Sequence, residues 1–120
     1  MKKWFVPWFV PGLLLVLVAL PAFADTIAAS DARAHVGQTV TVEGTVSNVH
    51  TSGRSGTVFL DIGGRYPHNA FTAVIFKRDT AKFHGVAALN GKTVDVTGKV
   101  QLYRGRPEII LNGAGQLKTR

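Results

Sequence analysis

Arginines and aromatic residues stand side by side in segments that are rich in turn-forming residues. Two of these segments are 63–69 (GGRYPHN) and 103–106 (YRGR), and a third, 51–56 (TSGRSG), holds a single arginine. Single-stranded nucleic acids bind such surfaces by stacking bases on aromatic rings, at about 1–3 kcal/mol per base, while basic side chains pair with the phosphates. The candidate residues for these contacts are Arg54, Phe59, Arg65, Tyr66, His68, Tyr103, Arg104 and Arg106.

The same residue types also have a purely structural interpretation. Phe71 or Phe76 could join Phe59 on a binding surface, but Phe71 and Tyr103 could equally pack inside the fold. Arg54 would then be an ordinary solvated charge in a loop, as most arginines are. The sequence leaves this choice open for each aromatic residue.

The acidic residues and histidines give little support for catalysis. The acidic residues occur singly, at Asp31, Glu43, Asp61, Asp79, Asp95 and Glu108. None has a close acidic neighbour in the sequence with which to share proton transfer. The four histidines are widely spaced, and the chain has no cysteine to serve as a thiolate ligand or nucleophile. We therefore predict a non-enzymatic protein without a metal or another cofactor.

The first 24 residues have the three-part pattern of a secretory signal peptide. A basic start at Lys2 and Lys3 precedes an apolar stretch over 4–20, and small residues at Ala22 and Ala24 suit a signal peptidase. A membrane span needs about 20 apolar residues, so an uncleaved anchor is the alternative. We predict cleavage after Ala24 and a periplasmic or secreted mature protein. Loss of the two lysines lowers the net charge from +7 to +5, which permits an acidic partner without requiring one.

The remaining chain divides into a short helical segment at 25–36 and a strand-rich domain at 37–120. Ser30 or Asp31 is expected to cap the first helix, and Asp79 a later helical turn. Apolar and polar residues alternate with the period of half-buried strands over most of the domain. The expected strands are 38–47, 57–62, 70–77, 92–103 and 106–111.

Two segments of the domain resemble each other. Residues 37–46 (GQTVTVEGTV) and 91–100 (GKTVDVTGKV) share a mid-strand glycine and three valines at matching positions. A glycine inside a strand suggests a bend or a bulge. Five short strands, two of them bent, favour a small closed barrel, which also removes exposed strand edges.

The stretch 91–111 (GKTVDVTGKVQLYRGRPEIIL) resembles the oligonucleotide/oligosaccharide-binding (OB) fold. The chain is also similar to small exported bacterial proteins that consist of one nucleic-acid-binding-like OB domain, particularly over 57–76 (TVFLDIGGRYPHNAFTAVIF). The likeness covers about residues 36–118. It implies an all-β protein with short helices, built as a five-stranded Greek-key barrel. Members bind ligands on the face of strands two and three and on the loops between strands one and two and strands four and five. Those positions hold the arginines and aromatic residues named above.

The resemblance implies single-stranded DNA or RNA, or a similar extended anionic ligand, as the partner. Some nucleases share this barrel, but no acidic and basic cluster in the sequence matches a nuclease site. Exported compartments hold little nucleic acid, so the alternative is a periplasmic protein-interaction or envelope-stress module. The barrel face would then meet a partner protein or a small ligand.

Overall fold

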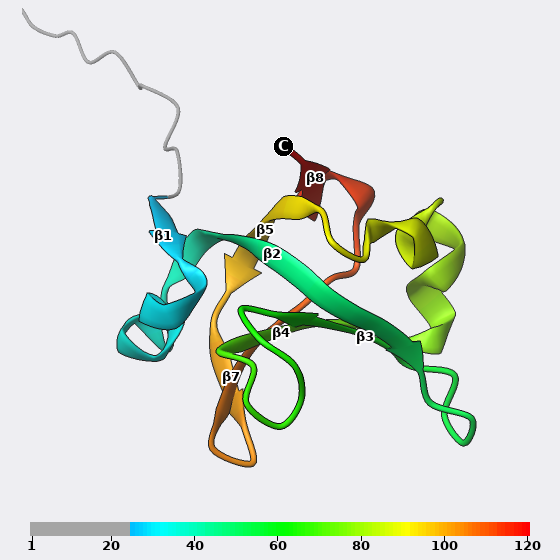
Figure 1. The fold of residues 1–120 in the computed structure, drawn as a ribbon, viewed down its shortest axis with the longest axis horizontal. Coiled ribbons are helices and arrows are strands. Elements are labelled where there is room, and N and C mark those ends of the chain that lie inside the picture. The colour runs from blue at the N-terminus through cyan, green and yellow to red at the C-terminus, as the bar shows by residue number, and fades with distance from the viewer. Residues whose placement is uncertain (1–24) are drawn as a thin grey trace, which may run out of the picture.

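Strands dominate residues 25–120, which are the part of the chain that the computed structural model describes. The signal peptide predicted for residues 1–24 lies outside the described residues. The strands are β1 (Thr26–Ala28), β2 (Thr39–Thr51), β3 (Val58–Ile62), β4 (Phe71–Ile75), β5 (Thr93–Lys99), β6 (Gln101–Tyr103), β7 (Arg106–Ile110) and β8 (Leu117–Thr119). The helices are short 3₁₀ turns, namely η2 (Ala29–His35), η3 (Lys77–Lys82), η4 (Val86–Leu89) and η5 (Ala114–Gln116). Figure 1 shows η2 and the η3–η4 pair at opposite ends of the curved sheet.

The hydrogen-bonded strand order is β6-β7-β4-β3-β2-β5-β8, with β1 added in parallel to β2. Along this order, β4 and β7 pair in parallel and the other neighbours are antiparallel. The strand expected at 92–103 is divided at Val100, whose backbone N–H donates to the carbonyl oxygen of Gln38 over 3.0 Å. Because β5 continues through Val100 into β6, one bent segment reaches from β2 to β7. The predicted mainly β, OB-type fold is confirmed, although the hydrogen-bonded order itself does not close into a ring.

The two similar segments lie in β2 and β5, which pair with each other along their whole shared length. Their mid-strand glycines have the same role in packing. A Cβ atom at Gly44 would lie 2.5 Å from Cγ2 of Ile62, and one at Gly98 would lie 2.6 Å from Cγ2 of Ile109. Each glycine therefore leaves room for an isoleucine, and a larger side chain would overpack the core.

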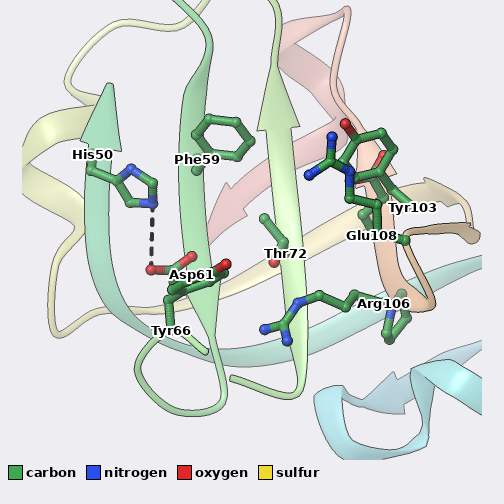
Figure 2. A pocket seen from close by; sticks show the side chains of 10 residues that line it. His50, Phe59, Asp61, Tyr66, Thr72, Tyr103, Arg106 and Glu108 are labelled. Atoms are coloured by element: carbon green, nitrogen blue, oxygen red, sulfur yellow. Dashed lines mark ion pairs between the residues drawn. The ribbon is translucent and has the colours of Figure 1, made fainter. Parts of the chain in front are cut away.

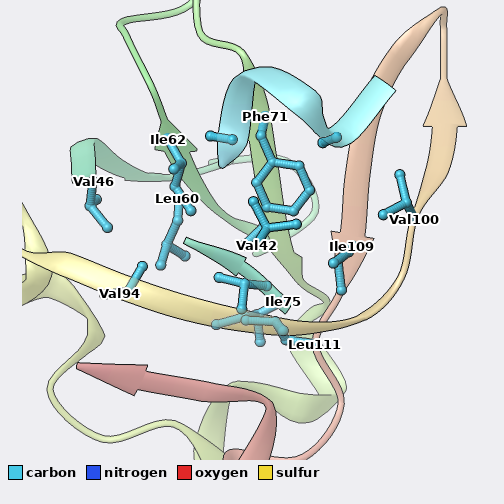
Figure 3. Packing of buried hydrophobic residues seen from close by; sticks show 14 of the residues in the cluster. Val42, Val46, Leu60, Ile62, Phe71, Ile75, Val94, Val100, Ile109 and Leu111 are labelled. Carbon is cyan, nitrogen blue, oxygen red and sulfur yellow. The ribbon is translucent and has the colours of Figure 1, made fainter. Parts of the chain in front are cut away.

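The inward-facing side chains of the strands form one hydrophobic core, and Ala29 and Ala32 of η2 pack against it (Figure 3). Its largest fully buried members are Phe71, Leu60, Ile62, Ile75, Ile109 and Leu111. A chain without cysteine depends on burial of this kind for its stability. Phe71 is 1% exposed, so its suggested place on a binding surface is wrong.

The predicted helix caps differ from those in the structure. Helix η2 begins after Ala28, with no side-chain hydrogen bond at its N-cap, so Ser30 and Asp31 do not cap it. Asp79 lies within η3 rather than before it, and its carboxylate accepts a hydrogen bond from Nζ of Lys82 over 2.9 Å. Neither helix therefore has the side-chain N-cap that the sequence suggested.

Among the helices of residues 25–120, none has the length and apolar character needed to cross a membrane.

Candidate functional site

The outer face of the curved sheet carries a pocket of about 280 Å³. Side chains alternate across a strand, so the residues between the core positions of β3, β4 and β7 all point to this face. The β3–β4 loop and the β6–β7 hairpin complete the wall. The lining residues are His50, Phe59, Asp61, Tyr66, Thr72, Tyr103, Arg104, Arg106, Pro107 and Glu108. Figure 2 shows Thr72 between Asp61 on one side and Glu108 on the other.

One wall of the pocket is a stacked pair of rings. His50 of β2 and Phe59 of β3 are partners in the strand register, and their ring centroids lie 5.1 Å apart with an interplanar angle of 19°. Phe59 is half-buried, so part of its surface faces the pocket. This pair offers a flat apolar surface of the kind on which a base stacks.

Two tyrosines stand at the rim, each with an arginine over its ring. Tyr66 of the β3–β4 loop is 67% exposed and Tyr103 of β6 is 55% exposed. The guanidinium carbon of Arg106 lies 5.0 Å from the centroid of Tyr66, and that of Arg104 lies 5.3 Å from the centroid of Tyr103. A guanidinium group at this distance holds a cation–π contact while its outer N–H groups remain able to donate. The rim therefore combines stacking surface with positive charge.

Arg106 also fixes the β3–β4 loop to the sheet. Its Nη2 donates to Oδ1 of Asn69 over 2.7 Å, and Nδ2 of Asn69 donates to Oγ1 of Thr72 over 2.8 Å. At the other end of the loop, the Ser47 hydroxyl donates to the carbonyl oxygens of Asp61 and Gly64. These bonds place Tyr66 over the pocket.

Two carboxylates lie at the bottom of the pocket. Asp61 is 1% exposed, and its Oδ2 lies 3.6 Å from Nε2 of His50. Glu108 is 9% exposed, and Nε2 of Gln101 donates to its Oε2 over 2.8 Å. Desolvation raises the pKa of Glu108, and the hydrogen bond from Gln101 opposes part of that effect. The site therefore has a negative floor beneath a positive rim.

The sequence matches a family model described as an OB-fold nucleic acid binding domain over residues 22–114. The chain belongs to this family. Its members' binding face corresponds to the outer face of β3 and β4 and the adjoining hairpins, where the pocket lies. No curated protein shows significant sequence similarity to this OB-fold domain.

Three solved structures are similar to the chain at low sequence identity. A protein from Leishmania major assigned as an aspartyl-tRNA synthetase has a TM-score of 0.51 and 15% identity, covering 89% of this chain and 22% of its own. Aspartyl tRNA synthetase from Entamoeba histolytica gives 0.49 and 16%, with 92% of this chain and 28% of its own covered. A Klebsiella pneumoniae protein assigned as a nucleic-acid-binding lipoprotein gives 0.45 and 15%, with 77% of each chain covered. The OB-fold domain thus spans 22% and 28% of the two synthetase chains, and the likeness concerns the fold alone.

The structure brings five of the eight predicted contact residues into this pocket. These five are Phe59, Tyr66, Tyr103, Arg104 and Arg106. Tyr103 is exposed, so the alternative that it packs in the core is wrong.

The other three predicted residues are exposed but do not line the pocket. Arg54 lies in the turn between β2 and β3, and Arg65 and His68 lie in the β3–β4 loop. These loops border the outer face, so the three remain predicted contacts for a ligand longer than the pocket.

Sequence analysis missed the polar residues of the floor. Asp61 and Glu108 are 47 positions apart in the sequence, but both are register partners of Thr72, in β3–β4 and β4–β7 respectively. Adjacent strands lie about 4.8 Å apart, so two strand spacings separate the carboxylates' backbones. Alternation within 57–62 does predict that Asp61 shares a face with Phe59, but it does not mark Asp61 as part of a site. The parallel pairing that adds Glu108 has no signal in the sequence.

Proposed function

We propose that the mature chain, exported by the signal at residues 1–24, binds single-stranded nucleic acid or a similarly extended anionic ligand on the outer face of its sheet. Binding without catalysis is the whole of the proposed activity. Membership of the OB-fold nucleic acid binding family supports the ligand class. The convergence of three aromatic rings and two arginines on one pocket supports the location and carries the proposal.

The pocket would hold one base, and the rest of a strand would extend over the adjoining loops. Small-molecule sites have volumes of about 300–1,000 Å³, and this pocket is at the lower limit of that range. Arg54 at the β2–β3 turn and Arg65 in the β3–β4 loop are exposed and would meet the neighbouring phosphates. Such contacts make affinity depend strongly on salt.

Fluorescence anisotropy with a labelled dT 12-mer over a salt series tests this function. With four phosphates contacted, one each by Arg54, Arg65 and the two rim arginines, the slope of log affinity against log salt should be about −3. Phe59→Ala should weaken binding about tenfold, because one stacking surface is lost. Phe76→Ala is the matched control, since Phe76 is half-buried like Phe59 but lies outside the pocket, beside Arg78.

Absence of binding to any single strand at low salt would reject this function. Equal losses from Phe59→Ala and Phe76→Ala would reject the assignment of the pocket while leaving the ligand class intact.

A protein partner is the second candidate, favoured by apolar exposure on the β6–β7 hairpin. Leu102 is 46% exposed and adjoins Tyr103, which is 55% exposed, and exposed apolar neighbours of this kind mark interaction surfaces. Leu102→Ser should leave oligonucleotide affinity unchanged. The same substitution should disrupt a complex with a protein recovered from the exported compartment.

A further inference from the structure

In the pocket, the acidic side chains lie at the bottom and the arginines lie at the rim. The carboxylates of Asp61 and Glu108 are 1% and 9% exposed, whereas the rim tyrosines that carry Arg104 and Arg106 are more than half exposed. Among residues 25–120, no ion pair joins either arginine to either carboxylate. The two kinds of charge are thus available to different parts of a ligand.

A phosphate cannot occupy the floor of such a pocket, because two buried carboxylates repel it strongly where water is scarce. The phosphates would therefore stay at the rim, with Arg104 and Arg106. The base would point inward along the stacked rings of His50 and Phe59, toward the carboxylates (Figure 2). This orientation differs from one in which the bases point outward and the phosphates follow the bottom of a groove.

The floor has acceptors that lack protein donors. Oδ2 of Asp61 is buried without a hydrogen-bond partner in the described residues, since His50 Nε2 lies 3.6 Å away. Buried polar atoms in proteins nearly always have a hydrogen-bond partner. A ligand that donates to Oδ2 of Asp61 would supply the missing partner. Gln101 donates to Oε2 of Glu108. The other carboxylate oxygen of Glu108 therefore remains an acceptor at the pocket wall.

We infer that Asp61 and Glu108 select a base that presents N–H donors at its Watson–Crick edge, and that guanine is preferred. The inference rests on the proposed function. Guanine presents two adjacent donors, N1–H and the N2 amino group, and so offers the acceptors of the floor more donors than any other base does. Cytosine and adenine present one amino group beside a ring acceptor. Thymine presents its N–H between two carbonyl oxygens, which a carboxylate repels.

Four labelled 8-mers test the inference, each with dT at seven positions and dG, dC, dA or dT at the centre. We expect the dG strand to bind about tenfold more tightly than the all-dT strand, with dC and dA between them. Replacing dG by deoxyinosine, which lacks the N2 amino group, should remove most of the preference. Equal affinity for all four strands would overturn the inference and leave the proposed function standing, whereas failure of all four to bind would overturn both.

Substitution of the carboxylates separates selection from general affinity. Glu108→Gln and Asp61→Asn should each reduce the preference for dG, while affinity for all-dT rises because a negative charge is removed. Asp95→Asn is the matched control, because Asp95 pairs with Arg120 outside the pocket. If Asp61→Asn fails to fold by circular dichroism, Glu108→Gln alone decides. A full dG preference in folded Glu108→Gln and Asp61→Asn would reject these residues as its source.

Discussion

Two regions of this OB-fold domain bring arginines and acidic residues together in opposite arrangements. Beside β5 and β8, Nε of Arg120 lies 2.9 Å from Oδ1 of Asp95 and 3.4 Å from Oε2 of Glu43. The hydrogen bond to Asp95 raises the pKa of Arg120 above its usual value. In the pocket, Arg104 and Arg106 lie over tyrosine rings instead, and the carboxylates contact neutral or weakly basic partners.

The difference separates a structural use of charge from a binding use. In the ion pairs beside β5 and β8, the positive and negative charges balance each other, and the pairs fix Arg120 to the sheet. The positive charges of the pocket arginines are not balanced by a carboxylate, because aromatic rings hold these side chains in place instead. Charge that is positioned but unpaired is what an anionic ligand can meet without first breaking an ion pair.

The largest expected difference between the two regions is in how much their arginines contribute to oligonucleotide affinity. The double substitution Arg104→Ala/Arg106→Ala should weaken binding of a dT 12-mer by tenfold or more at low salt, because hydrogen bonds to charged groups contribute about 1.5–3 kcal/mol each. It should also reduce the salt slope by about 1.4, since two contacts are lost. Arg120→Ala, the control, removes one positive charge as well and should change neither quantity appreciably. Comparable losses in the two proteins would show that net charge alone drives binding.

A smaller effect is expected from pH, and it acts in the pocket alone. Burial raises the pKa of Glu108, so this residue binds a proton before an exposed glutamate does as the pH falls. Protonation removes a negative charge near Arg104, Arg106 and Asp61, so affinity for a dT strand should rise as the pH is lowered through that pKa. Anisotropy measured over a series of falling pH values checks this, and Glu108→Gln should remove the part of the rise that Glu108 causes.

The free energy of unfolding should also depend on pH through the titration of Glu108. Because the pKa of Glu108 is higher in the folded state than in the unfolded state, the folded state binds more protons between the two values. The contribution of Glu108 to the free energy of unfolding is therefore favourable at low pH and is lost as the pH rises through the folded pKa. Urea unfolding of wild type and Glu108→Gln across this range should show the difference shrinking as the pH falls. A pH-independent difference would exclude titration of Glu108 as its cause.

The smallest effect is expected at β5 and β8. Arg120→Ala should lower the free energy of unfolding only slightly, because exposed ion pairs contribute little and salt screens them. Urea unfolding at low and high salt measures the loss, which should shrink with added salt. A larger loss that salt does not reduce would show that Arg120 acts by packing, and the contrast with the pocket would fail.

The fold could be predicted to a considerable extent because alternation is a local property. The strands expected at 57–62 and 106–111 correspond to β3 and β7 within one residue at each end. The division of 92–103 at Val100 was missed, because the backbone bond to Gln38 that accompanies it is a long-range contact. The predicted caps of η2 were wrong because the helix begins after Ala28, without a side-chain cap, and buries Ala29 and Ala32 against the core.

The site could be predicted only in part, for a related reason. Tyr66 and Arg106 stand in segments whose composition already indicates exposed turns, so their availability to a ligand could be expected. Their mutual contact over 5.0 Å depends on how β7 pairs with β4. Glu108 looked like an isolated acid because its partners across the sheet are distant in the sequence.

By itself the sequence determined the mainly β architecture, the mid-strand glycines and the supply of arginines and aromatic rings, since period, turn chemistry and composition are encoded locally. Tertiary structure alone decided that Phe71 is buried while Phe59 and Tyr103 face outward, and that two solitary acids lie beneath two arginines. The physical reason is that strand pairing fixes which distant residues share a face, and a shift of one residue in register would move each side chain to the opposite face.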